Sequence, residues 1–414
     1  MRIRRATLRV TLRATLRATA ALFALASCTG GDGGTDGGMD AGNDAGLDAP
    51  IRDIGNDNGD AYAIDAAAPG TLRIQTLGVQ GFVLTYGGES VMTAPLFTRQ
   101  NGVDVALNAP ITPDLAGIDA GLAHVDMSLV RAIVTGHAHY DHLMDVIHIM
   151  STMSPTSLLY ANRTARHVFA AVAPDRSASC TTPAPTETVD RARVIALDDP
   201  LASHVDYTNC PDQRPTGAPI AGSWVMVPGS HVRLMPVCTV HPAQIGTMHF
   251  APGSIDTDQC DVPAAASGWL EGQTLSYVID FLDTAGAPVF RIYYQDAPAT
   301  RPIGEVPAAI LAEHRVDLSI LCVGSNDAVD NQPTDIIANL NPRFALSGHW
   351  ENFFVPRSAP LQPLPTLNLG RFLTRAEAAL SAPPDVPVYV NGAPLVGRHI
   401  LMNPDMDIYL SPAP

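Results

Sequence analysis

The chain has 414 residues, of which 46% are hydrophobic and 16% are charged. This composition can supply a large folded core, and so low a charged fraction is more typical of an exported protein than of a cytosolic enzyme. The 25 basic residues are all arginine and are outnumbered by 41 acidic residues, which gives a formal net charge of −16. Such a charge repels nucleic acid and anionic headgroups at long range, which argues against a nucleic-acid partner.

The N-terminus has the pattern of an export signal. Arginines are frequent before Ala18, and the short apolar segment 20–27 follows them. Because this segment is too short to span a bilayer as a helix, residues 1–27 are predicted to be a signal peptide. Leu25-Ala26-Ser27-Cys28 resembles a bacterial lipobox, which predicts lipid attachment at Cys28. We therefore expect a lipid-anchored protein of the cell envelope, at the outer membrane or facing the periplasm; the alternative is an ordinary secretory signal with an incidental cysteine.

Residues 28–70 are rich in Gly, Asp, Ala and Asn and contain almost no aromatic residues. Such a segment cannot bury enough apolar surface to fold, so it is predicted to be a flexible tether. Hydrophobic alternation begins at Thr71, where residues 72–76, 81–86 and 90–92 are typical of strands, with Gly87-Gly88 as a turn. A folded domain is therefore expected over residues 71–414.

The sequence Gly-His-Ala-His-Tyr-Asp-His at residues 136–142 follows the apolar run 132–134. Zn²⁺ and similar cations prefer imidazole nitrogen and carboxylate oxygen. The spacing provides two ligand sets, His137 with His139 and Asp141 with His142, and a regular strand would place His142 alone on the opposite face. An incidental His-rich turn is disfavoured because closely packed imidazoles repel each other when protonated.

This motif resembles the His-x-His-x-Asp-His signature of the metallo-β-lactamase superfamily. The resemblance implies an α/β fold, a four-layer αββα sandwich, and three further ligands that each follow a later strand. His241 follows the strand-like run 232–240, Asp296 follows 289–294, and His349 follows 344–348, in the order that the resemblance requires. The implied ligand set is His137, His139 and His241 on one metal, Asp141, His142 and His349 on the other, with Asp296 bridging.

The resemblance implies a hydrolase with two zinc ions, or with iron or manganese instead, that attacks an ester, lactone, phosphodiester or amide of a small molecule through a metal-bridged hydroxide. Asp141 and His349 are the candidate catalytic residues. Two other functions stay open: a non-haem iron redox enzyme or oxygenase, and a surface-anchored binding lipoprotein stabilised by metal. A serine nucleophile is disfavoured because the chain has no Gly-x-Ser-x-Gly motif.

Details around the last ligand resemble one branch of the superfamily. Gly348-His349-Trp350, followed by Phe353, is similar to the branch that includes ascorbate-phosphate lactonase and the phospholipase D that releases N-acylethanolamines. The family's usual Asp-Pro pair, which braces the metal-binding loop after the first hairpin, is replaced here by Thr93-Ala94-Pro95.

Helices and strands are expected to alternate along the rest of the domain, with insertions near 173–223 and 242–268. Helices are predicted over 143–150, 164–172, 307–314 and 334–340, and strands over 157–161, 194–197 and 318–323. His148 and His167 are predicted to be surface or packed residues. Apolar side chains are expected to form a wall over the metals or simply to pack a covering loop on the core: Met248, Phe250, Trp269, Trp350 and Phe353.

Cysteine usage is compatible with export. Cys180, Cys210 and Cys260 lie in Pro- and Asp-rich segments, so a disulfide is expected among them, with Cys180–Cys210 as the first expectation. Cys238 and Cys322 lie in apolar strands and are predicted to be buried thiols.

Overall fold

The computed structural model describes residues 70–413 except 184, 200–217, 383–387, 391–392 and 396. The predicted signal peptide, the lipid attachment at Cys28, all but the last residue of the tether, and Cys210 therefore lie outside the described residues. Within the described part of the chain, no helix is long and apolar enough to cross a membrane.

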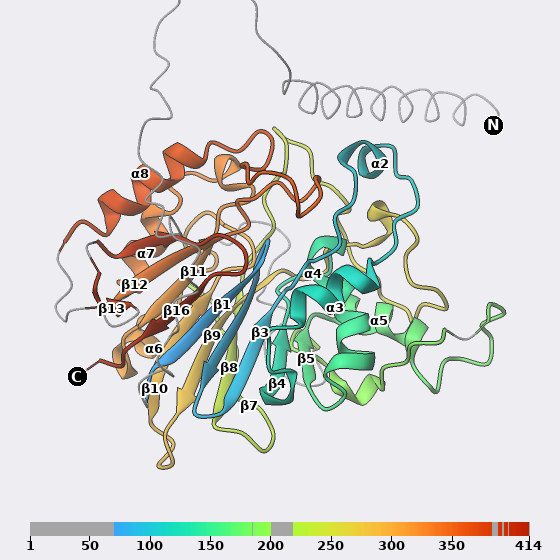
Figure 1. The fold of residues 1–414 in the computed structure, drawn as a ribbon, viewed down its shortest axis with the longest axis horizontal. Helices are drawn as coiled ribbons and strands as arrows, with labels where there is room; N and C mark the ends of the chain where they lie inside the picture. Colours follow the sequence, from blue (N-terminus) through green and yellow to red (C-terminus); the bar gives the residue numbers. More distant parts are fainter. Residues whose placement is uncertain are drawn as a thin grey trace, which may run out of the picture.

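Two mixed sheets form the centre of the domain (Figure 1). In spatial order, the first sheet contains β14 (Ala393–Pro394), β13 (Tyr389–Val390), β16 (Asp407–Leu410), β1 (Leu72–Gly78), β2 (Gly81–Tyr86), β3 (Glu89–Thr93), β4 (Val130–Val134), β5 (Leu158–Ala161) and β6 (Val194–Ala196). The second contains β15 (His399–Leu401), β12 (Phe344–Gly348), β11 (Leu318–Cys322), β10 (Pro288–Tyr294), β9 (Leu275–Leu282), β8 (Val232–Cys238) and β7 (Val225–Met226). The antiparallel pairing of β1 with β16 joins the two ends of the described chain.

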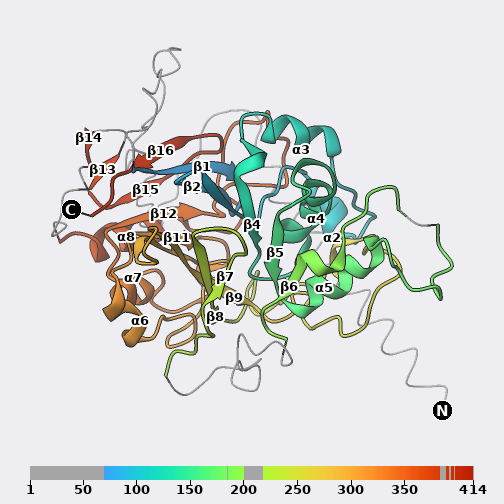
Figure 2. The same cartoon turned by 90° about the horizontal axis from the view of Figure 1, so that it is seen from below.

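Helices cover the outer face of each sheet (Figures 1 and 2). The α-helices of the described chain are α2 (Gly102–Ala106), α3 (Leu115–Leu122), α4 (Tyr140–His148), α5 (Arg163–Phe169), α6 (Ala308–Glu313), α7 (Thr334–Leu340) and α8 (Leu369–Ala379). Helices α3, α4 and α5 pack on the first sheet, and α7 and α8 pack on the second. The αββα sandwich expected from the resemblance to metallo-β-lactamases is confirmed.

Strand alternation explains why there are three hydrophobic clusters. In β10, Phe290 and Ile292 point into the cluster between the two sheets, while Tyr293 points toward the helices of the second sheet. In β2, Phe82 points between the sheets and Val83 points toward α3 and α4. Since both faces of each sheet are buried, most strand side chains are apolar, and register is fixed by their alternation.

A disulfide joins the two insertions, but not with the pairing that we expected. Cys180 is bonded to Cys260, 80 residues further along the chain, so the first expectation of Cys180–Cys210 is wrong. Cys238, predicted to be a buried thiol, is disulfide-bonded as well. Cys322 is a buried free thiol, as predicted. The expectation failed because the second insertion folds back across the first, a contact that loop composition does not encode.

Candidate metal centre

The histidine-rich motif spans the loop after β4 and the start of α4. His139 is the N-cap of α4, so Asp141 lies in the first helical turn and His142 in the same helix. The picture of a regular strand with alternating faces is therefore wrong. The loop is held by backbone hydrogen bonds, because Leu275 N donates to Gly136 O at 2.7 Å and Ala138 N donates to the carbonyl of residue 271 at 2.9 Å.

The three later ligands also lie just beyond the carboxyl ends of strands. His241 follows β8, Asp296 follows β10, and His349 follows β12 directly. Fixed strand ends hold reactive side chains precisely, while the loops between them remain free to vary.

The structure brings all seven predicted ligands together. Their possible ligand atoms form three groups, and within each group the atoms lie within 4.8 Å of one another. The groups are His137, His139 and His241; His137, His142 and Asp296; and Asp141, His142 and His349. The first and third groups reproduce the two predicted ligand triplets, and Asp296 contacts a member of each.

Asp296 lies between the triplets and is held by three donors. Its Oδ2 is 2.6 Å from His137 Nδ1, its Oδ1 is 3.0 Å from His142 Nδ1, and the Tyr294 hydroxyl donates to Oδ1. Burial alone would raise the pKa of this carboxyl, but the charges and hydrogen bonds of His142 and His137 hold it well below its usual range. Asp296 is therefore ionised at neutral pH.

The pKa values of His139, His241 and Asp141 are also shifted toward the forms that bind metal. Burial, together with repulsion from His137, lowers the pKa of His139 to about 3 and that of His241 well below its usual value. Burial would raise the pKa of Asp141, but the charges of His142 and His349 hold it well below its usual range. Neutral imidazoles and ionised carboxylates are the forms that bind cations.

Hydrogen bonds of the imidazoles show which nitrogens are free to bind a cation. His139 Nε2 lies 3.3 Å from Ala251 O, and His241 Nδ1 lies 2.7 Å from Pro242 O. An imidazole N–H directed at a carbonyl leaves the lone pair on the other nitrogen, which is the usual arrangement in metal-binding histidines. His137 Nε2 is buried and has no hydrogen-bond partner among the described residues. A cation would satisfy this atom, so the side chains present fit a metal centre.

The apolar side chains that were expected either to form a wall over the metals or to pack a loop on the core divide between these two positions. The ring of Phe353 packs edge-on against His349 with 5.4 Å between ring centroids. Trp350 does not belong to the wall, because it is buried in the cluster beneath α8 and donates its indole N–H to Met402 O. Trp269 is buried in the cluster beneath α3 to α5. Met248 and Phe250 are half-buried in the segment that ends at Ala251 beside His139.

Asp145, which we did not single out in the sequence, braces the metal-binding helix. Its buried carboxylate accepts hydrogen bonds from Phe97 N, Thr98 N and Thr98 Oγ1, so it ties α4 to the segment after β3. Asp145 therefore fixes the segment that follows Thr93-Ala94-Pro95 against the metal-binding helix. The sequence contains a signal for this contact, because Asp145 lies among apolar residues of a predicted helix and a buried carboxylate needs hydrogen-bond donors.

His148 and His167 are not part of the centre, as predicted. His148 lies between the carboxylates of Asp119 and Glu187, and His167 contacts Asp258. Both are held by carboxylates outside the ligand groups.

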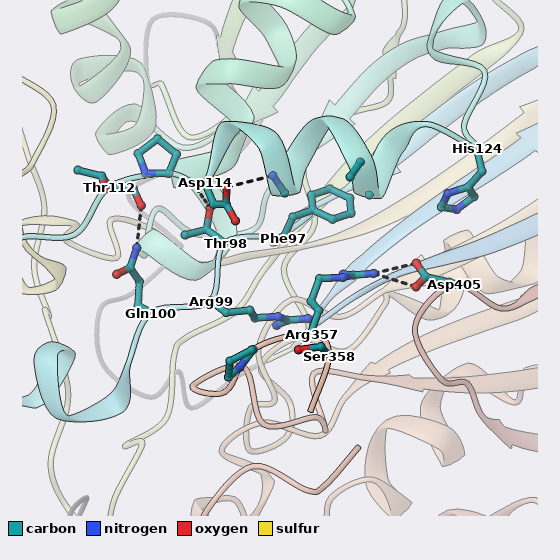
Figure 3. A pocket seen from close by; sticks show the side chains of 15 residues that line it. Phe97, Thr98, Arg99, Gln100, Thr112, Asp114, His124, Arg357, Ser358 and Asp405 are labelled. Atoms are coloured by element: carbon teal, nitrogen blue, oxygen red, sulfur yellow. Dashed lines mark hydrogen bonds and ion pairs between the residues drawn. The ribbon is translucent and has the colours of Figure 1, made fainter. Parts of the chain in front are cut away.

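A cavity of about 640 Å³ lies beside the loop that follows His349. It is enclosed by the segment after β3, by α3, and by residues 356–358 (Figure 3). Arg99 and Arg357 extend along its floor, where Arg357 binds both carboxylate oxygens of Asp405. None of the seven candidate ligands lines this cavity.

Comparisons with known proteins give structural likenesses alone. No family model and no curated protein matches the chain. Igni18, a metallo hydrolase from Ignicoccus hospitalis, is 13% identical, with a TM-score of 0.42 and coverage of 82% of this chain and 98% of that chain. YhfI, a metallo-beta-lactamase fold protein from Bacillus subtilis, is 11% identical, with a TM-score of 0.40 and coverage of 81% and 98%. CmlA, a diiron beta-hydroxylase from Streptomyces venezuelae, is 10% identical, with a TM-score of 0.41 and coverage of 83% and 55%. Since all three TM-scores lie below 0.5, the assignment of the site rests on its own geometry.

Proposed function

We propose that this chain is a metal-dependent hydrolase that acts on an ester, lactone, phosphodiester or amide of a small molecule. The observation that carries this proposal is the convergence of two largely buried ligand triplets on either side of Asp296. A structural zinc site is usually a closed cage of four ligands, whereas a catalytic site has three protein ligands and an open position. Two triplets that share one carboxylate resemble a catalytic site more than a closed structural cage.

Zinc is the proposed metal, because the donors are imidazole nitrogens and carboxylate oxygens. His137, His139 and His241 would hold one ion, and Asp141, His142 and His349 the other. Bound zinc supplies Lewis acidity and lowers the pKa of water toward neutrality, which makes a nucleophile available at pH 7. Iron or manganese in the same positions is the alternative, and iron would open redox chemistry.

The protein's own residues supply orientation and proton transfer. Tyr294, His137 and His142 hold Asp296 from three directions, so its carboxylate is fixed before substrate binds. Asp141 is ionised, and its Oδ2 lies 3.4 Å from His349 Nε2. It can therefore accept or relay a proton during turnover, which we propose as its second role besides metal binding.

The surroundings favour a substrate with an apolar body. Phe353 shields one side of His349, and the half-buried Met248 and Phe250 belong to the segment that reaches His139. An ionic floor with an apolar wall suits an acyl or aromatic group attached to the scissile bond.

The test is hydrolysis by zinc-loaded and metal-depleted protein of a panel of lactone, phosphodiester, amide and thioester substrates. We expect at least one substrate class to be turned over only by the loaded protein, and His137→Ala to abolish that turnover. His167→Ala is the matched control, because it removes an imidazole outside the centre. Full activity of the metal-free protein would contradict the proposal, and dioxygen-dependent turnover with bound iron would favour the redox alternative.

We also propose that the native protein is anchored to the envelope by a lipid on Cys28. The support is the lipobox-like Leu25-Ala26-Ser27-Cys28 ahead of a segment with tether composition. The native protein should partition with membranes and begin at Cys28 by intact-mass measurement, whereas Cys28→Ser should accumulate as uncleaved precursor. A native chain that still starts at Met1 without modification would refute this location.

A further inference from the structure

His349 and Val79 both have left-handed backbone conformations, with φ angles of 57° and 54°. These conformations are unfavourable for residues with a Cβ, and especially for a β-branched residue such as valine. Strained residues persist only where their surroundings hold them, and they cluster at functional sites. The position of a candidate metal ligand therefore depends on contacts that keep two residues in costly conformations.

A chain of hydrogen bonds links the two strained residues. His349 N donates to Val79 O at 2.5 Å, so the last ligand is held by the turn between β1 and β2. Val79 N in turn donates to Glu351 Oε1 at 2.7 Å. The turn and the segment 349–351 therefore bind each other through both polar groups of the Val79 backbone.

Arg99 completes this arrangement from the segment after β3. Its Nη2 lies 2.7 Å from Glu351 Oε1, the same oxygen that accepts Val79 N. The side chains of Arg99 and Glu351 are only 8% and 6% exposed. Gly78 fits beneath them closely, since a Cβ at this position would lie 2.7 Å from Glu351 Oε1 and 3.1 Å from Arg99 Nη2.

A buried ion pair is weak support for fold stability, because desolvation offsets much of the attraction between its charges. The Arg99–Glu351 pair is better explained by the backbone conformations that its contacts hold in place. Glu351 follows the candidate ligand by two residues, and its carboxylate is anchored by a guanidinium from a different part of the chain. Figure 3 shows Arg99 beside Arg357, and both side chains line the cavity.

We propose that Glu351 and Arg99 are positioning residues, which hold Val79 and His349 in their left-handed conformations and so place His349 against Asp141 and His142. This inference rests on the proposed metal-dependent function and concerns the second ligand triplet alone. The first triplet is held separately, because His137 and His139 lie in the loop fixed by Leu275 and the carbonyl of residue 271. Loss of the pair should therefore weaken one metal position and leave the other intact.

The experiment is equilibrium zinc titration of the purified protein, with affinities measured by competition against chelators. Loss of an outer partner of a metal ligand typically lowers metal affinity by about 10- to 100-fold. Glu351→Ala removes the acceptor of Val79 N, and we expect this loss for one of the two zinc equivalents only. Glu351→Gln retains an oxygen acceptor and should restore most of the affinity. Adding Val79→Gly to Glu351→Ala should also restore most of the zinc affinity, because glycine adopts positive φ at little cost.

Asp317→Ala is the matched control. Asp317 is a buried carboxylate paired with Arg343 at 2.8 Å, but it precedes β11 and so lies at the opposite end of that strand from the centre. This variant should unfold at lower denaturant concentration and still bind zinc like the wild type. Arg99→Met provides the same test as Glu351→Ala if alanine at position 351 prevents folding.

Two results would overturn the inference. One is a folded Glu351→Ala or Arg99→Met protein that binds both zinc equivalents as tightly as the wild type. The other is an equal loss of both equivalents, which would indicate a general structural role. A wild-type protein that binds no zinc would instead count against the proposed function, so the two failures can be distinguished.

Discussion

Gly136→Ala should break the candidate metal centre with a single methyl group. A Cβ on Gly136 would lie 2.1 Å from Leu275 O, 2.3 Å from Asp296 Cβ and 2.6 Å from Asp296 Oδ2. Two of these contacts are with the side chain that lies between the two ligand triplets, and the third is with the backbone that braces the metal-binding loop. The two shortest contacts, with Leu275 O and Asp296 Cβ, cannot be relieved by rotating the end of a flexible side chain.

The size of the effect follows from these overlaps. Forcing an extra methyl group into a packed site typically costs about 1 to 3 kcal/mol through shifted backbone and side chains. The shift would move Asp296 away from His137, whose Nδ1 lies 2.6 Å from Oδ2. It would also strain the hydrogen bond from Leu275 N to Gly136 O. We therefore expect lower stability together with weaker zinc binding at both positions.

Urea unfolding and zinc titration of the same preparation measure the two effects. Gly370→Ala is the control, because its Cβ would meet nothing closer than Asn368 Oδ1 at 4.0 Å in the exposed first turn of α8. Alanine in a helix should raise stability by up to about 1 kcal/mol and leave zinc binding unchanged. Wild-type stability and zinc content in Gly136→Ala would show that the centre accommodates the added methyl group.

Three further predictions concern groups around the centre. Tyr294→Phe removes a hydroxyl group that donates a hydrogen bond to ionised Asp296. Because a hydrogen bond to a charged group is worth about 1.5 to 3 kcal/mol, the zinc affinity measured by chelator competition should fall at least tenfold. Zinc affinity equal to that of the wild type would contradict this. Burial lowers the pKa of His148, but two neighbouring carboxylates outweigh it and raise that pKa above its usual 6.5. The contribution of protonated His148 to the free energy of unfolding should therefore be complete below about pH 6.5 and disappear as the pH rises through the folded-state pKa. The difference in urea midpoint between wild type and His148→Gln should shrink as the pH rises. A difference that stays constant with pH would count against the ion pairs. Replacing Cys180 and Cys260 with serine removes a disulfide between residues that are 80 positions apart in the sequence. The free energy of unfolding should fall by about 2 to 4 kcal/mol, and zinc binding should be unchanged. A simultaneous loss of zinc would show that the disulfide also determines the geometry of the metal centre.

Much of the fold and the ligand set could be predicted from sequence because both depend on local pattern. Apolar runs marked the strands, and each of His241, Asp296 and His349 stands just after such a run. The pairing of strands into two sheets brings these ends together, so residues more than 200 positions apart meet at one centre.

What could not be predicted depends on contacts between distant segments. The sequence of α4 does not show that Asp145 meets the backbone after β3. The sequence left open whether Trp350 lines the site or packs on the core, and it packs beneath α8 because the positive φ of His349 turns the chain away from the centre. The partner of Cys180 likewise depends on how two insertions cross.

If the chain holds two metal ions at its two ligand triplets, anomalous diffraction at the zinc edge from crystals of zinc-loaded protein will locate both ions. We predict two anomalous peaks, one among His137, His139 and His241 and one among Asp141, His142 and His349, with Asp296 between them. Zinc-loaded crystals with no peak at these side chains, or with peaks only elsewhere on the molecule, would show that the chain does not hold metal at its ligand triplets.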